Sequence, residues 1–287
     1  MSLLSLNLNP APPGAGLLCV RRKVKKNPCQ ACLDACPLTA ISLTEGNVVI
    51  DEARCNQCGR CLFACPTDAL ENIYPVKRHW HQDRLCAPLS AQPACVDELL
   101  MWHFHYGIRA IELDTPDEGW LRAVAELNLT LRTLEQPVWR LAQPAENTVN
   151  TGRRQWLRMA NDADSGSVPA GRRALRDAVT SINLYAIKLN AEQCYLCGAC
   201  ARICPEQAIR LGADHIVMDN ARCTGCGQCT AVCFPDAIHS VKALNNHAGQ
   251  RLPIIQQRCD TCGQLFSAWT AGHSTCPFCR QHTLCMR

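Results

Sequence analysis

The sequence lacks the features that mark a membrane protein, a secreted protein or a common type of enzyme. No apolar stretch approaches the roughly eighteen residues that a transmembrane helix needs. Residues 1–18 have no basic segment before their apolar residues, and Arg21 and Arg22 are followed by KVKK, so no export signal is expected. A phosphate-binding loop, a catalytic triad motif and a flavin fingerprint are also absent. We therefore expect a cytoplasmic protein without catalytic residues of its own.

Cysteine, in contrast, is abundant, at 23 of 287 residues. A small secreted protein with this composition would be expected to form disulfides. Here most of the cysteines are spaced as C-x2-C pairs, and no export signal accompanies them. The pattern therefore favours metal binding in a reducing compartment.

The clearest cysteine pattern lies between Cys194 and Cys233. It consists of two runs with the spacing C-x2-C-x2-C-x3-C-P, which begin at Cys194 and Cys223. This spacing resembles that of bacterial two-cluster ferredoxins, in which the fourth cysteine of each run binds the other run's 4Fe–4S cluster. The resemblance implies one cluster held by Cys194, Cys197, Cys200 and Cys233, and another held by Cys223, Cys226, Cys229 and Cys204.

An earlier part of the chain repeats this pattern with one cysteine missing. In both copies eighteen residues separate the last cysteine of the first run from the first cysteine of the second, so one structural unit occurs twice. In this alignment Lys26 stands where Cys194 stands in the later copy, and an ammonium group cannot replace a thiolate on iron. Nine residues separate Cys19 from Cys29, and a loop of that length can return Cys19 to the cluster at modest entropic cost.

We therefore predict that the earlier copy also binds two clusters. The alternatives for its first site are a three-iron cluster or an empty site. The predicted ligand sets are Cys19, Cys29, Cys32 and Cys65 for one cluster, and Cys55, Cys58, Cys61 and Cys36 for the other.

Four further cysteines near the C-terminus form two C-x2-C knuckles separated by thirteen residues, namely Cys259, Cys262, Cys276 and Cys279. This arrangement predicts a zinc ribbon. A single iron is the alternative, because a tetrahedron of four thiolates suits either metal. The spacing assigns Cys86, Cys95 and Cys285 to no site.

The patterns predict an α+β protein with several domains. Residues 76–145 alternate helix and strand signals, which predicts a small α/β unit. This order resembles the small iron–sulfur delta subunits of methyl-viologen-reducing hydrogenases. The remaining predicted parts are a flexible N-terminal arm (1–18), two two-cluster ferredoxin-like domains (19–75 and 184–247), a linker (146–183) and a zinc ribbon (248–287).

The formal net charge of +4 does not describe the metal-bound protein. A 4Fe–4S core with four thiolates carries about −2, so four clusters and a four-thiolate zinc site would bring the total to about −6. Nucleic-acid binding is therefore not expected. The basic segment 21–26 is either a solvated loop or a docking patch for an acidic redox partner.

As a whole the chain resembles bacterial polyferredoxins, which are built from tandem two-cluster ferredoxin domains. The resemblance implies one-electron transfer through about four 4Fe–4S clusters, as a subunit or partner of a larger oxidoreductase of the formate dehydrogenase or hydrogenase type. The alternative is an accessory or maturation factor for a redox metalloenzyme, because zinc ribbons often dock proteins.

Overall fold

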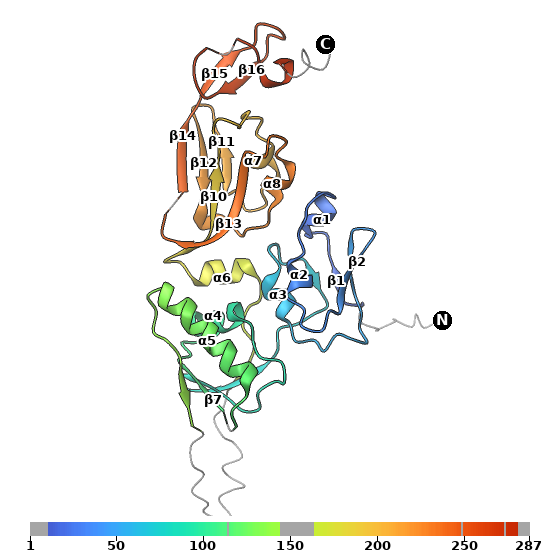
Figure 1. The fold of residues 1–287 in the computed structure, drawn as a ribbon, viewed down its shortest axis with the longest axis vertical. Coiled ribbons are helices and arrows are strands. Elements are labelled where there is room, and N and C mark those ends of the chain that lie inside the picture. Colours follow the sequence, from blue (N-terminus) through green and yellow to red (C-terminus); the bar gives the residue numbers. More distant parts are fainter. Residues whose placement is uncertain (1–10, 114, 144–163, 248, 273, 281–287) are drawn as a thin grey trace, which may run out of the picture. The chain divides into compact units, whose positions relative to one another are not determined.

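The computed structural model describes residues 11–113, 115–143, 164–247, 249–272 and 274–280 (Figure 1). The chain divides into two compact units. One consists of residues up to Cys19 together with Gln30–Ala178, and the other of Val20–Cys29 together with the chain from Val179 onward. No helix in the described part of the chain is both long enough and apolar enough to cross a bilayer.

The first unit opens with a small antiparallel sheet and two short helices, α2 (Ala31–Asp34) and α3 (Arg60–Ala64). The strands follow the order β2-β3-β1-β4. Their bounds are β1 Gly14–Ala15, β2 Ile41–Thr44, β3 Asn47–Ile50 and β4 Leu70–Glu71. Strand β1 lies in the segment predicted as a flexible arm, of which residues 1–10 are outside the described part.

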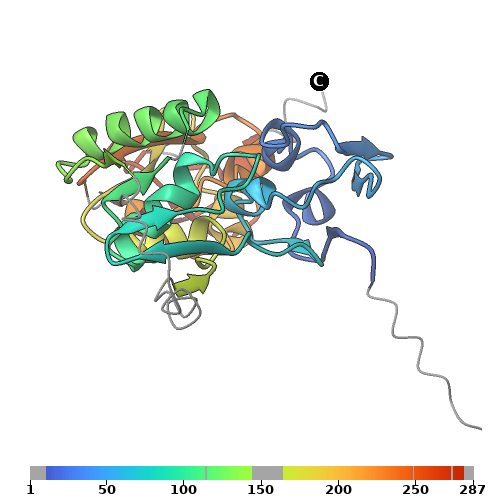
Figure 2. The same cartoon turned by 90° about the horizontal axis from the view of Figure 1, so that it is seen from below.

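A second sheet of the same unit has the order β8-β7-β6-β5-β9, and its strands β6, β7 and β8 are parallel. Helix α4 (Val96–His105) joins β6 to β7, and helix α5 (Glu118–Thr133) joins β7 to β8. The two helices lie against each other (Figures 1 and 2). The strand bounds are β5 Arg78–His81, β6 Arg84–Cys86, β7 Ala110–Glu112, β8 Arg140–Ala142 and β9 Asp164–Gly166.

Elements α4, β7, α5 and β8 form the helix–strand–helix–strand order predicted for residues 76–145. The region also contains strands and a helix that were not predicted. The antiparallel hairpin β5–β6 precedes the first helix and was not predicted. The predicted linker contributes strand β9, which pairs with β5, and helix α6 (Arg172–Ala178). Residues 144–163 of that linker lie outside the described part.

Local sequence signals explain where helices α4 and α5 begin and end. Helix α4 is followed by Gly107, whose φ of +70° is the left-handed geometry that commonly ends a helix. Helix α5 begins after Asp117, whose carboxylate accepts a hydrogen bond from the backbone N–H of Trp120 at 2.9 Å. The buried positions of α5 then recur at intervals of three or four residues, which places one apolar face against the rest of the unit.

Arg78 on β5 and Glu98 on α4 form an almost completely buried ion pair, with side-chain exposures of 3% and 1%. The Arg78 Nη2 atom lies 3.0 Å from Glu98 Oε2, and Nη1 donates to Ser90 Oγ at 3.1 Å. The guanidinium carbon also lies 5.0 Å from the ring centroid of Trp120 on α5. One arginine side chain therefore links the sheet to both helices.

Replacing Glu98 with alanine should strongly destabilise this region, because the Arg78 charge would stay buried without a counter-ion. We expect a loss of about 3–5 kcal/mol in the free energy of unfolding. Urea unfolding followed by tryptophan fluorescence under anaerobic conditions measures this loss.

The matched control is Glu118→Ala, which removes an ion pair with Arg122 on the surface of α5. These side chains are 91% and 71% exposed, so the control should cost less than about 1 kcal/mol. Equal losses for the two variants would contradict the role assigned to the buried pair.

The second unit contains two small sheets built around the later cysteine runs. Strand β10 (Asn183–Leu189) pairs with β13 (Ile238–Asn245), and a second sheet has the order β11-β12-β14. The other elements with printed bounds are α1 Val20–Lys23, α7 Ala199–Ile203, β11 Ile209–Leu211, β12 His215–Asp219, η1 Asn220–Arg222, α8 Gln228–Val232 and β14 Gly249–Pro253.

The last part of this unit is a hairpin of β15 (Ile255–Arg258) and β16 (Leu265–Ala268). Strand β14, which the sequence placed in the ribbon, instead pairs with β12. Residues 249–253 therefore extend the sheet that packs around the cysteine runs. The reason is that a backbone ladder with β12 satisfies their N–H and C=O groups.

Candidate metal centre

The later cysteine runs share a backbone feature that positions their third cysteine. Helices α7 and α8 each begin after a glycine, Gly198 or Gly227, whose φ values are +73° and +69°. This left-handed geometry turns the chain sharply, and glycine adopts it without strain. The third cysteine of each run is then the second residue of the helix that follows. The corresponding residues in the earlier copy are Gln30, with φ of −128°, and Gly59, with φ of +72°.

The structure brings cysteines of the two later runs close to one another. The neighbouring thiols that act on Cys194 are those of Cys233 and Cys197, and those that act on Cys200 are Cys194, Cys229 and Cys197. The fourth cysteine of the first run, Cys204, lies instead with the second set, whose other members are Cys223, Cys226 and Cys229. Each run thus has the fourth cysteine of the other run near its first cysteine, Cys233 near Cys194 and Cys204 near Cys223.

Burial controls the state of these thiols. It raises the pKa of Cys200 and that of Cys223 to about 12. Neighbouring thiols raise the pKa further, because two thiolates repel each other. Without metal these cysteines remain protonated at neutral pH, and metal binding must release their protons.

In the first unit, four cysteines line one cavity together with apolar residues of β2, β3 and the segment after β4. They are the predicted set Cys36, Cys55, Cys58 and Cys61. Burial raises the pKa of Cys61 to about 12, and the Cys32 thiol also lies near it. The cavity walls are largely aliphatic, with Ile41, Ile50 and Ile73 packed around Cys61.

The environment of Cys65 matches that of Cys233 in the other copy. The backbone N–H of Ala69 donates to Cys65 Sγ at 3.2 Å, and that of Ala237 donates to Cys233 Sγ at 3.2 Å. The strand that follows is paired in the same register in both copies, because Leu70 pairs with Ala15 as Ile238 pairs with Leu189.

This shared register places Cys19 within one residue of the position of Cys194. Gly16 N–H donates to the Ala69 carbonyl at 2.7 Å, and Asn190 N–H donates to the Ala237 carbonyl at 2.8 Å. Cys19 N–H then returns to the Gly16 carbonyl, three residues back, at 3.1 Å, and Cys194 N–H returns to the Asn190 carbonyl, four residues back, at 3.1 Å. The hydroxyl of Thr67 further holds the Leu18 carbonyl at 2.9 Å, close in sequence to both Cys19 and Cys65.

The sequence alignment therefore placed the extra residues differently from the structure. Counted back from Cys29, Lys26 matches Cys194, whereas the strand register matches Gly16 with Asn190. Cys19 is three residues after Gly16 and Cys194 is four residues after Asn190, so Cys19 lies one residue short of the position of Cys194. The nine residues between Cys19 and Cys29 replace the two between Cys194 and Cys197. They include helix α1, and Arg21 donates to the Cys29 carbonyl at 2.9 Å across this insertion. The Cys29 N–H donates to Asn27 Oδ1 at 2.9 Å.

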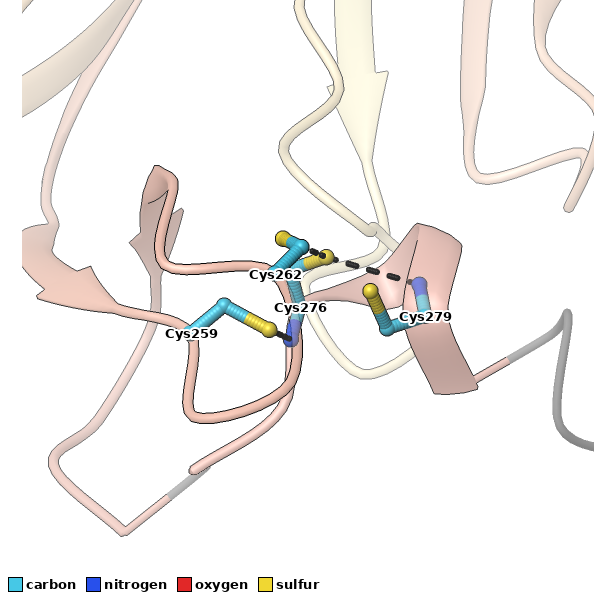
Figure 3. Close-up of side chains that lie close together, drawn as sticks. All are labelled: Cys259, Cys262, Cys276 and Cys279. Atoms are coloured by element: carbon cyan, nitrogen blue, oxygen red, sulfur yellow. Dashed lines mark hydrogen bonds between the residues drawn. The ribbon is translucent and has the colours of Figure 1, made fainter.

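The four C-terminal cysteines converge, with one sulfur atom from each within 4.8 Å of the others (Figure 3). Cys259 and Cys262 lie in the turn of the β15–β16 hairpin, and Cys276 and Cys279 lie at a following helical turn. The Cys262 and Cys276 sulfurs are 3.9 Å apart. Tetrahedral coordination with Zn–S bonds of about 2.3 Å places sulfurs about 3.8 Å apart, so these residues fit a four-thiolate metal site.

Backbone N–H groups at this site favour the thiolate form of cysteine, which is the form that binds a metal. The Cys276 N–H donates to Cys259 Sγ at 3.2 Å, and such donors lower the pKa of Cys259 to about 6. The same part of the chain reaches the later cysteine runs, because the Trp269 indole N–H donates to the Cys194 carbonyl at 2.9 Å.

The remaining cysteines belong to none of these sets. Cys86 ends strand β6, and Cys95 immediately precedes helix α4. Cys285 lies outside the described residues.

Comparison with known families agrees with the cysteine patterns. Residues 193–237 match a model described as a 4Fe-4S dicluster domain, and residues 48–71 match one described as a 4Fe-4S binding domain. The chain thus contains two ferredoxin-type 4Fe–4S domains and a group of four cysteines near its C-terminus. No curated protein matches the chain. The earlier match begins after Cys36, so it omits the run in which Cys19 stands apart from Cys29.

Replacing Cys19 with serine should disturb one cluster of the earlier domain. We expect a three-iron species, seen by EPR of the oxidised protein, or a loss of about four irons per chain. The control is Cys86→Ser, which should leave the iron content unchanged. Full iron and an unchanged spectrum for Cys19→Ser would exclude Cys19 as a ligand and turn attention to Cys86 and Cys95.

Replacing Cys276 with serine should abolish metal binding at the C-terminal site, because three thiolates hold zinc much less tightly than four. Metal analysis should show a loss of about one zinc per chain with the iron content retained. A site that holds less than about half an equivalent of zinc in the unmodified protein, together with a rubredoxin-like visible spectrum, would identify iron instead.

Proposed function

We propose that this protein transfers single electrons through about four 4Fe–4S clusters. The observation that supports this most directly is that Cys233 lies near Cys194 and Cys204 lies near Cys223, as expected if the two runs exchange their fourth cysteines as cluster ligands. Two clusters held in this way must be close neighbours, because each run of cysteines contributes to both. Close neighbours are what rapid one-electron transfer requires.

The ligand assignments complete this proposal. Cys19, Cys29, Cys32 and Cys65 would hold one cluster of the earlier domain, and Cys36, Cys55, Cys58 and Cys61 the other. The later domain would use the two sets that its spacing predicts. These sets are complete, so each cluster would have four protein thiolates and no open iron position for a substrate.

Backbone hydrogen bonds would adjust the potentials of the clusters. Amide N–H groups donate to the sulfurs of Cys36, Cys65, Cys194 and Cys233 at 3.2–3.4 Å. Such donors favour the more negative, reduced cluster and so raise its reduction potential. The protein would in this way set the order in which electrons occupy the clusters.

In sequence order, the proposed organisation is a two-cluster domain at about 19–75, the α/β region, a second two-cluster domain at about 184–253 and a zinc-binding ribbon. We further propose a cytoplasmic location and a larger oxidoreductase of the formate dehydrogenase or hydrogenase type as the partner. This partner class rests on analogy with polyferredoxins.

Metal analysis and a redox titration test this function. Anaerobically purified protein should contain about sixteen irons and sixteen sulfides per chain. Dithionite reduction should bleach the visible absorbance reversibly, and EPR should show interacting reduced clusters. About eight irons or fewer would contradict the assignment of two two-cluster domains, and clusters that do not cycle would contradict electron transfer.

A second candidate function is a maturation factor for a redox metalloenzyme. It is favoured by apolar side chains on the C-terminal region, where Leu265 is 65% and Phe278 is 70% exposed. Such side chains suit protein docking. Co-purification from the native host separates the two functions, because an electron carrier should accompany the active enzyme and a maturation factor should accompany only the immature enzyme.

A further inference from the structure

A hollow in the surface of the second unit lies beside Cys197. Residues of α7 and β11 line it, among them Gly198, Arg202 and Arg210. Both arginines are exposed, and so is Cys197 itself. The other three cysteines of its set are partly buried. Cys197 is therefore the most exposed residue of this proposed cluster set.

The two arginines make this hollow electropositive. Arg202 Nη2 donates to the Cys197 carbonyl at 2.8 Å, which fixes one guanidinium directly beside the cysteine loop. Arg210 Nη1 donates to the Gln207 carbonyl at 3.1 Å, and its nearest carboxylate oxygen, on Asp219, is 3.9 Å away. Within the described part of the chain, no carboxylate forms an ion pair with Arg202.

An exposed aromatic residue is adjacent in sequence to one cysteine of the same proposed cluster. Phe234 directly follows Cys233, which belongs to the set of Cys197, and its side chain is 86% exposed. Aromatic and arginine side chains are the types most enriched at the centres of protein interfaces. The surroundings of this cluster therefore have the chemistry of a protein-binding surface.

We propose that the hollow beside Cys197 is a docking surface for an acidic redox protein, through which the cluster of Cys194, Cys197, Cys200 and Cys233 exchanges electrons. This inference rests on the electron-transfer function proposed above. In each exchange one electron leaves the reduced cluster for the acceptor, so the cluster is oxidised, the acceptor is reduced and no covalent bond changes.

The charge of the cluster explains why arginines are needed there. A 4Fe–4S core with four thiolates carries about −2 and would repel an acidic partner. Two guanidinium groups at the same place offset that charge and can bind carboxylates in bidentate fashion. Their attraction would speed the encounter and orient the partner toward Cys197.

Charge reversal of both arginines tests the proposal. Stopped-flow kinetics would follow the oxidation of the reduced protein by an acidic flavodoxin and, separately, by a basic cytochrome c. At low ionic strength, Arg202→Glu/Arg210→Glu should lower the rate with flavodoxin by about tenfold or more and should not lower the rate with cytochrome c. Added salt should reduce the difference.

The matched control is Lys188→Glu/Lys242→Glu, which changes the net charge by the same amount. Both lysines are exposed and lie on the sheet of β10 and β13. This control should change the flavodoxin rate by less than about twofold, because its charges are not at the docking surface. A second variant, Arg202→Gln/Arg210→Gln, removes the positive charges but retains N–H donors, and should lower the rate about threefold with full iron content.

The outcomes distinguish this inference from the function on which it rests. If the reduced, unmodified protein passes electrons to neither acceptor, the proposed function is wrong. If it reduces both acceptors, and the iron-replete arginine variants behave like the lysine control, then electron transfer stands and the docking surface is wrong. A selective loss with flavodoxin supports both.

Discussion

Burial of the cysteine sulfurs is the constraint on which both cysteine-rich regions depend. Burial, together with neighbouring cysteines of the same region, raises the pKa values of Cys61, Cys200 and Cys223 to about 12. Thiolates are stable in such places only when a metal compensates their charge. The apolar residues around them are few, so cluster binding and folding of these regions should be coupled.

The two copies share a backbone frame, which is a set of hydrogen bonds around the last cysteine and the first strand. This frame is retained where the cysteine spacing differs. In each, an alanine four residues after the last cysteine donates its N–H to that sulfur, and its carbonyl accepts an N–H from the residue after the first strand. That frame also holds the residue that leads into Cys19 or Cys194. An insertion between Cys19 and Cys29 can therefore lengthen the loop without moving the strands on which the loop begins.

The α/β region is stabilised by a different interaction and has none of the cysteine sets. The buried Arg78–Glu98 pair, which contacts Trp120, links its sheet to both of its helices. Helix α6 links this region to the earlier cysteine-rich region of the same unit, because Arg173 donates to the Thr67 carbonyl at 2.9 Å and pairs with Asp68 at 3.1 Å. The segment predicted as a linker thus takes part in packing.

Sequence alone was sufficient to predict two 4Fe–4S-type segments, the grouping of Cys36 with Cys55, Cys58 and Cys61 around one cavity, and the four-cysteine group near the C-terminus. Coordination chemistry fixes short spacings, and short spacings survive as local sequence patterns. The helices and strands of residues 96–142 were also predictable, because amphipathic periodicity and terminal signals such as Asp117 and Gly107 are local.

Only the tertiary structure decided the features that depend on pairing between distant segments. Strand β14 joins β12, β9 joins β5, and Gly16 meets Ala69, although no local pattern marks these partners. That Cys19 lies within one residue of the position of Cys194 emerges in the same way, from strand register rather than from spacing. Backbone hydrogen bonds between strands are nearly independent of side-chain identity, so the sequence around Cys19 carries little sign of the frame that positions it.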